Sequence, residues 1–263
     1  MAQQSNKEGP FVIGVDAGTE SLRAGVFDLQ GNPLAFSSTA YQTTFPKPGW
    51  AEQNPQDWWE ALGKSVKNSI SEAGISSSAV AAICLDTTCC SVVALDENGD
   101  PLRPCLIWMD LRSAPQTEKV LATGDKALRV NSNGQGPVSA EWMIPKSLWI
   151  KENEPDLFEK AATICEFQDY MNFHLTGRKC ASINNVSARW HYDRSQGGIP
   201  ETMLEKLGLG DLSEKWPGDV LDLGETIGGL TPKAAEHLGL PKELPVIQGC
   251  LLYTSPSPRD VRS

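Results

Sequence analysis

A carboxylate, a glycine and two hydroxyl side chains lie close together near the start of the chain. They are Asp16, Gly18, Thr19 and Ser21, and Arg23 follows them. Glycine lets a backbone approach a bulky anion, the hydroxyls and Arg23 can donate to phosphate oxygens, and a carboxylate at a strand end can hold hydrated Mg²⁺. Because a bare carboxylate repels phosphate, Asp16 favours a magnesium nucleotide over free phosphate. The alternative is an ordinary turn whose hydroxyls cap exposed amides, since turns favour the same residue types.

An indole, a carboxylate and a guanidinium alternate further along, at Trp108, Asp110 and Arg112. Alternate residues of an extended segment share one face, so we expect these three side chains on the same side. A flat apolar wall, an acceptor and several donors together suit a polyol. The alternative is a surface Asp–Arg pair beside a packed tryptophan.

A third polar stretch covers residues 182–190 and includes Asn184, Asn185 and Arg189. It follows Gly177, which we expect to end a helix. Two amides and a cation in this place predict a loop lined for hydroxyl recognition.

The elements that must position these residues alternate between strands and helices. Apolar runs at 11–16, 22–29 and 34–41 predict a three-stranded antiparallel meander, and the helical periodicity after Asn54 predicts a helix that ends at Gly74. We expect further strands at 80–86, 91–95 and 106–108, and further helices at 140–153, 168–175 and 201–207. The pattern predicts an α/β fold with a mixed sheet flanked by helices.

Composition excludes several classes of partner. The formal net charge of −10 provides no broad cationic surface for nucleic acid, and no apolar run reaches the roughly 20 residues of a membrane-spanning helix. The first residues lack the apolar core of a secretory signal, so we expect a cytoplasmic protein. The seven cysteines show no zinc-type spacing and are expected to be free thiols, and the three histidines show no ligand spacing.

The motifs also resemble those of a known family. Residues 14–23 resemble the first phosphate motif of the superfamily that contains sugar kinases, heat-shock proteins and actin. Residues 11–250 as a whole are similar to the N-terminal domain of the FGGY carbohydrate kinases, on motifs at 14–23, 50–55, 57–59, 85–88, 106–112 and 245–249. The resemblance implies a ribonuclease H-like fold of the actin-like ATPase superfamily. It also implies ATP and Mg²⁺ as cofactors, with ATP held mainly by a second domain.

The same resemblance assigns a sugar-facing loop. It places Thr88, Cys89 and Cys90 near the substrate, whereas the alternative for the cysteines is a core position. Cys89 and Cys90 stand where glycerol kinases have a charged pair, so a pentulose or pentitol is favoured over glycerol. Arg189 stands where the ribulokinase-like members have lysine, which leaves the identity of the sugar open.

The resemblance implies that the parent protein phosphorylates a sugar or polyol hydroxyl with ATP. We expect a polar lead at 1–10, the sugar-binding domain at 11–250, and a foreign-looking tail at 251–263 in place of the ATP-binding domain. The family's catalytic aspartate is expected just beyond Gly249, where this chain has leucines, so no catalytic residue is assigned and this chain is expected to be inactive. A homodimer of the parent is left open. The alternatives are a non-catalytic sugar-binding fragment and an actin- or chaperone-type ATPase module.

Overall fold

Three antiparallel strands open the fold, in a computed structural model that describes residues 9–131 and 137–250. β1 (Phe11–Ala17) pairs with β2 (Ser21–Asp28), and β2 pairs with β3 (Pro33–Ala40). The predicted meander is therefore confirmed. Most of the predicted lead, and all of the predicted tail, lie outside the described residues.

Helix α1 (Pro55–Ala73) packs against this meander, and local signals fix both of its ends. The Asn54 side chain accepts a hydrogen bond from the backbone N–H of Gln56, and Pro55 occupies the first turn, where its missing N–H costs nothing. Gly74 ends the helix with a left-handed φ of 66°, which favours glycine. Both ends of the helix agree with the prediction.

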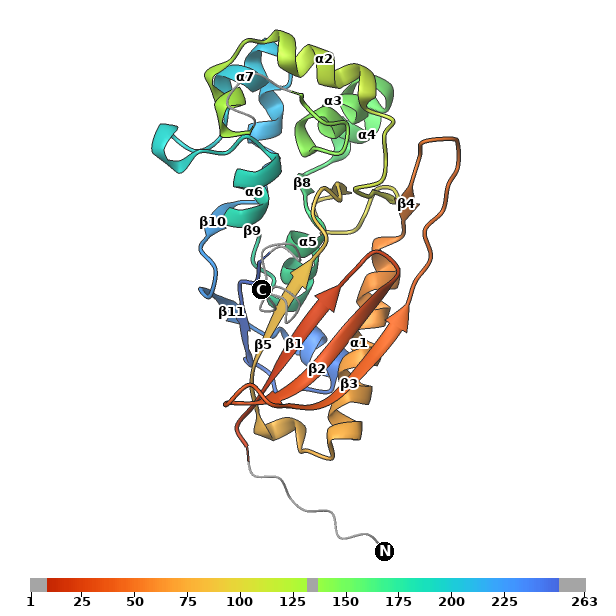
Figure 1. The fold of residues 1–263 in the computed structure, drawn as a ribbon, viewed down its shortest axis with the longest axis vertical. Coiled ribbons are helices and arrows are strands. Elements are labelled where there is room, and N and C mark those ends of the chain that lie inside the picture. Colours follow the sequence, from red (N-terminus) through yellow and green to blue (C-terminus); the bar gives the residue numbers. More distant parts are fainter. Residues whose placement is uncertain (1–8, 132–136, 251–263) are drawn as a thin grey trace, which may run out of the picture.

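The meander forms one side of a mixed six-stranded sheet. β5 (Val80–Thr87) runs parallel to β1, and β12 (Pro245–Ile247) runs parallel to β5. β11 (Thr226–Gly229) completes the other edge in antiparallel pairing, which gives the order β11-β12-β5-β1-β2-β3. The carboxyl ends of the parallel strands β1, β5 and β12 therefore meet at one edge of the sheet (Figure 1).

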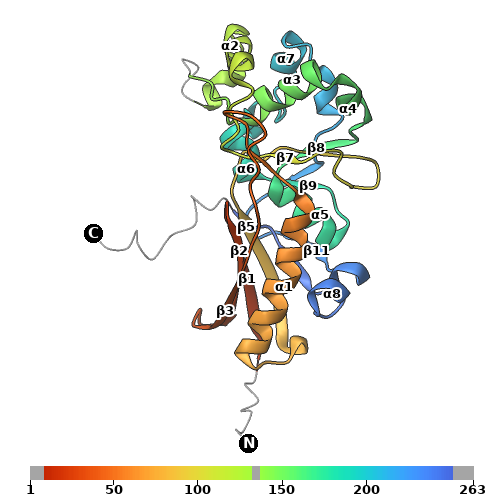
Figure 2. The ribbon, with the colours of Figure 1, turned by 90° about the vertical axis from the view of Figure 1, so that its right-hand side faces the viewer.

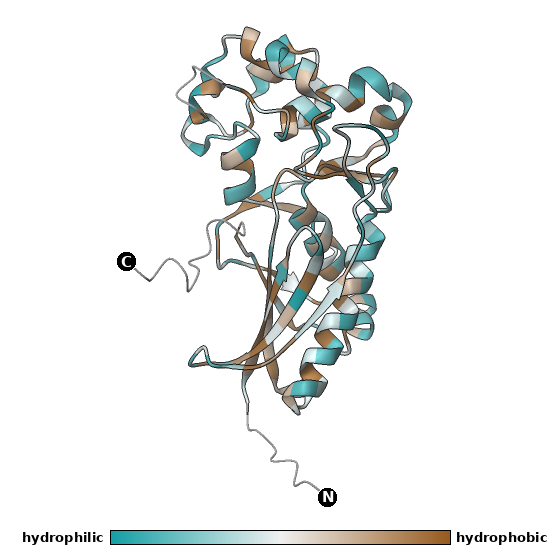
Figure 3. Cartoon of the chain, turned by 45° about the vertical axis from the view of Figure 1, so that its right-hand side comes forward, coloured by the Kyte–Doolittle hydropathy of each residue, from teal (hydrophilic) through white to brown (hydrophobic). Residues whose placement is uncertain are grey.

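One face of the sheet is covered by three helices. α1, α5 (Phe167–Thr176) and α8 (Pro232–Leu238) lie on the same side of the strands (Figure 2). Every second residue of β1 is buried, and α1 alternates between hydrophobic and hydrophilic residues along its length (Figure 3). The indole of Trp58 stacks on the Phe167 ring at a centroid distance of 3.6 Å, which joins α1 to α5.

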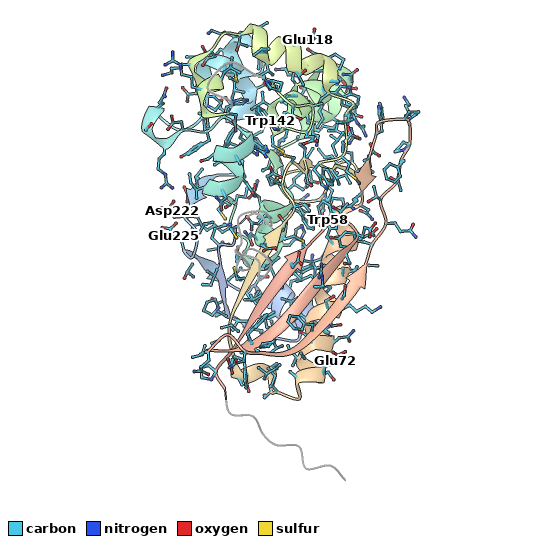
Figure 4. All side chains as sticks on the ribbon, in the orientation of Figure 1. Trp58, Glu72, Glu118, Trp142, Asp222 and Glu225 are labelled. Carbon is cyan, nitrogen blue, oxygen red and sulfur yellow. The ribbon has the colours of Figure 1, made fainter. Side chains whose placement is uncertain are left out.

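A helical lobe lies beyond the carboxyl edge of the sheet and has its own apolar cluster (Figure 1). Figure 4 places Trp142 within this lobe and Trp58 near the boundary with the sheet. The helices of the lobe are α2 (Ala114–Ala122), α3 (Met143–Asn153), α4 (Pro155–Lys160), α6 (Ile183–Arg189) and α7 (Glu201–Lys206). Short paired strands link the two parts, namely β4 (Glu52–Gln53) with β7 (Cys105–Leu106), β6 (Val93–Leu95) with β8 (Thr163–Cys165), and β9 (Cys180–Ser182) with β10 (Asp219–Leu221).

Several predicted boundaries shift in the structure. The strands expected at 91–95 and 106–108 shorten to β6 and β7, and the helix expected from residue 140 begins at Met143. The stretch 182–190, predicted as a loop, is mainly the helix α6. Within the described residues, no helix has the length and apolarity needed to cross a bilayer.

Candidate functional site

The β1–β2 turn presents the acid and the hydroxyls together, as their spacing predicts. Asp16 faces Arg23 across the two strands, and an Oδ of Asp16 lies 3.3 Å from the guanidinium. The turn is closed by a hydrogen bond from the Gly18 N–H to the Ser21 carbonyl at 3.0 Å. A side-chain carbon built on Gly18 would meet only that carbonyl, at 3.5 Å, so the space in front of the glycine is largely unfilled by the described residues.

Two carboxylates lie side by side at the carboxyl ends of β1 and β5. Asp16 and Asp86 are direct partners in the parallel ladder, and both line a cavity of about 700 Å³. By strand alternation they point away from α1, toward the face of the sheet that the helices leave open. Asp16 Oδ1 is buried without a hydrogen-bond partner among the described residues. A hard cation, held directly or through water, fits these oxygens.

The end of β12 forms the far wall of the same cavity, which Gln248, Gly249 and Cys250 line. Gly249 lies so close to β5 that an added side-chain carbon would meet the Leu85 carbonyl oxygen at 1.8 Å. Gln168 from α5 donates hydrogen bonds to the Leu85 and Cys250 carbonyls at 2.8 and 3.2 Å, which joins the two strand ends. Only glycine allows this close approach.

The loop after β5 lies beside the β1–β2 turn. The Thr88 N–H donates a hydrogen bond to the Ala17 carbonyl at 3.0 Å. Cys89 is 8% exposed, and its Sγ lies 3.7 Å from Cys90 Sγ. The hydrogen bond from Cys90, assisted by the charge of Arg189, lowers the pKa of the Cys89 thiol to about 7. Cys90 is buried and has a left-handed φ of 62°, which is uncommon for a residue with a side chain.

Trp108, Asp110 and Arg112 do not share a face as predicted, because residues 107–113 form turns instead of an extended segment. Trp108 is partly exposed, and its Nε1 donates to the Thr19 hydroxyl at 3.0 Å. Arg112, by contrast, is buried in a charged cluster. Its guanidinium contacts the Asp110 and Glu52 carboxylates at 2.7 Å each. The prediction that the three side chains share a face is therefore wrong: Asp110 and Arg112 are buried, with Arg112 over the Trp50 ring, whereas Trp108 is partly exposed.

The third predicted patch lies on a helix. Asn185, in α6, is fully buried, and its amide lies 3.4 Å from the Gln168 side-chain oxygen. Arg189, at the end of α6, is partly exposed and lies over the Trp142 ring at 5.8 Å from its centroid. Asn184 is partly exposed on the same helix. The prediction of a loop here is wrong, because the helix continues from Ile183 to Arg189.

Comparisons with known proteins decide the family. Residues 11–251 match the family described as "FGGY family of carbohydrate kinases, N-terminal domain". The chain belongs to this family. It is 30% identical to a human FGGY carbohydrate kinase domain-containing protein, in an alignment that covers 91% of this chain and 45% of the human protein. A ribulokinase of Shouchella clausii is 33% identical over 88% of this chain and 46% of its own length.

Solved structures show the same FGGY fold. A xylulose kinase from Rhodospirillum rubrum superposes with a TM-score of 0.79 at 27% identity, over 92% of this chain and 49% of that one. This agrees with the predicted mixed sheet and with its ribonuclease H-like, actin-like assignment. The chain spans about half the length of the curated relatives it matches. The family match does not favour the actin- or chaperone-type alternative.

Two buried charged residues of this FGGY domain were not identified from the sequence. Lys146 lies on α3 and Glu166 stands at the start of α5, and neither side chain is exposed. Both contact the loop after β5. The Lys146 ammonium donates to the Cys90 carbonyl at 2.7 Å, and Glu166 accepts from the Ser91 N–H at 3.0 Å. A charged residue within an apolar run was the signal that could have revealed Lys146.

Proposed function

We propose that this chain is the sugar-binding part of an ATP-dependent carbohydrate kinase. The hydrogen bond between Trp108 and Thr19 carries the proposal, because it joins an aromatic wall suited to sugar C–H groups to a turn suited to phosphate. The names of relatives, among them xylulose kinases and ribulokinases, support a pentulose or pentitol as the acceptor.

In this proposal different residues of the chain bind the sugar, the phosphates of ATP and Mg²⁺. Trp108 and Arg189 contact the sugar, with Thr88, Cys89 and Asn184 around it. Gly18, Thr19, Ser21 and Arg23 face the phosphates of ATP, and Asp16 with Asp86 holds Mg²⁺. Bound Mg²⁺ neutralises phosphate charge during phosphoryl transfer. Asp110, Arg112 and Asn185 are buried and support these contacts. Because the chain spans half of its relatives, transfer is proposed for the whole protein and sugar binding for this chain.

Isothermal titration calorimetry with D-ribulose, D-xylulose, L-ribulose, ribitol and glycerol tests the proposal. We expect binding of at least one pentulose or pentitol, and weaker or no binding of glycerol. Arg189→Met should weaken that binding, whereas Arg194→Met should not, because Arg194 forms an exposed pair with Asp222 and neither side chain lines the cavity. A folded chain that binds none of these five compounds would contradict the proposal.

A further inference from the structure

Lys146 occupies an unusual place for a lysine. Its side chain is fully buried within the helical lobe, although lysine is almost never buried without partners. The ammonium donates one hydrogen bond to the Cys90 carbonyl and another to the Ile107 carbonyl, each at 2.7 Å. Removing an ammonium from water costs several kcal/mol, so two carbonyl contacts alone are a poor reason to bury it.

The two carbonyls belong to two different segments of the proposed sugar site. Cys90 ends the loop that carries Thr88 and Cys89, and Ile107 directly precedes Trp108. Cys90 and Ile107 lie 17 residues apart in the chain. A single ammonium thus fixes the spacing between the loop and the aromatic wall.

Glu166 holds the same loop from the other side. Its carboxylate accepts hydrogen bonds from the N–H groups of Cys90 and Ser91 at 3.2 and 3.0 Å. It also accepts from the Trp190 indole at 3.2 Å, and Trp190 directly follows Arg189. Lys146 and Glu166 therefore both hold the Cys90 backbone, and Glu166 also ties it to the third sugar-facing segment. This accounts for a left-handed φ of 62° at a cysteine, because surrounding contacts must enforce such a conformation.

We propose that Lys146 is a positioning residue, which, with Glu166, sets the relative placement of Cys89, Trp108 and Arg189 around the sugar. The inference rests on the proposed function and concerns the same site. Hydroxyl recognition depends on donors and walls held within about half an ångström of their productive positions, and supporting contacts provide that accuracy. Lys146 itself touches no sugar in this arrangement.

Lys146→Met tests the proposal, with Lys151→Met as the matched control. Both lysines lie on α3, but Lys151 is partly exposed and pairs with Asp211. Lys146→Met leaves the buried Cys90 and Ile107 carbonyls without their donor, so we expect its thermal unfolding midpoint to fall, and sugar binding is measured at a temperature at which the variant is shown to be folded. We expect its Kd for the pentulose or pentitol bound by the wild type to rise by about tenfold, the loss typical of a charge-assisted hydrogen bond.

The outcomes separate the two proposals. Lys151→Met should bind the sugar within about twofold of the wild type, as expected for an exposed pair. A folded Lys146→Met with wild-type affinity overturns the positioning role and leaves the proposed function intact. If no wild-type binding is detected, the proposed function falls and this inference falls with it.

A second variant keeps the test decisive if Lys146→Met does not fold. Lys146→Arg keeps a buried cation, but a planar guanidinium cannot occupy the place of an ammonium between two carbonyls without moving them. We expect a folded protein with a sugar Kd raised by about threefold to tenfold. Wild-type affinity in Lys146→Arg would then overturn the positioning role.

Discussion

The indole Nε1 of Trp108 donates a hydrogen bond to the Thr19 hydroxyl at 3.0 Å, although the two residues lie 89 positions apart. Thr19 belongs to the turn that presents Asp16, and its carbonyl also accepts a hydrogen bond from the Gln53 amide at 2.6 Å. A sugar lying against the indole therefore lies next to the proposed phosphate turn. This adjacency is what transfer of a phosphoryl group to a hydroxyl requires.

The first prediction concerns this contact. Trp108→Phe keeps an aromatic wall but removes the N–H, and Thr19→Val removes the acceptor at nearly constant volume. We expect each variant to weaken sugar binding, and the double variant to be no weaker than the more impaired single one. A double-mutant cycle of calorimetric Kd values should give a coupling of about 1 kcal/mol. Additive losses would show that the hydrogen bond does not hold the wall in place.

The second prediction concerns the buried charged cluster of Glu52, Asp110 and Arg112. The Arg112 guanidinium contacts both Asp110 and Glu52 and lies 3.7 Å from the Trp50 ring centroid. Arg112→Met leaves the buried Asp110 carboxylate without its cation, whereas Glu52 keeps its contact with Arg103, so the free energy of unfolding should fall by about 3–5 kcal/mol in urea denaturation. Arg194→Met, which breaks an exposed pair with Asp222, should cost less than about 1 kcal/mol. Similar losses in the two variants would contradict the role assigned to burial.

The predictable parts of the fold are those with local signals. The apolar runs and tight turns of the meander, and the cap and proline before α1, predict those elements within one or two residues. Likewise, the acid and hydroxyls of the β1–β2 turn could be identified because they are neighbours in sequence. The α6 helix was missed because asparagine and serine favour turns, and burial of Asn185 and Val186 overrides that preference.

The unpredicted parts depend on partners far apart in the chain. Asp110 and Arg112 were predicted to face a polyol, with a surface pair as the alternative, and their burial depends on Glu52, 60 residues before Arg112 in the chain. Asp86 joins Asp16 only through the parallel register of β1 and β5. Lys146 stands in an apolar run, which marks it as unusual, but its two partners come from distant loops, so the sequence does not show what it binds.

The third prediction concerns thiol reactivity. The hydrogen bond from Cys90 is the main cause that lowers the pKa of Cys89 to about 7, whereas burial raises the pKa of Cys84 to about 11. Iodoacetamide should therefore modify Cys89 with a rate that levels off above pH 7, and Cys84 with a rate that still rises at pH 9. Peptide mass spectrometry measures both. Cys90→Ala should shift the Cys89 profile to higher pH, and an unchanged profile would exclude the Cys90 contact as its cause.

The fourth prediction concerns stability at acidic pH. His191 is 1% exposed, and burial lowers its pKa from 6.5 to about 4. The unfolded chain binds a proton at His191 near pH 6.5, whereas the folded protein binds it only near pH 4. The contribution of His191 to the free energy of unfolding is therefore complete above pH 6.5 and is lost as the pH falls toward 4.

Urea denaturation between pH 7.5 and 4 measures the free energy of unfolding of the wild type and of His191→Asn. Asparagine keeps a polar side chain and tolerates the left-handed φ of 55° at this position. The wild type should lose about 3 kcal/mol relative to the variant over this range, because each pKa unit corresponds to about 1.4 kcal/mol. The two curves should run parallel above pH 7, where both states are neutral at this position. Parallel curves down to pH 4 would mean that His191 takes up its proton equally in the folded and unfolded protein.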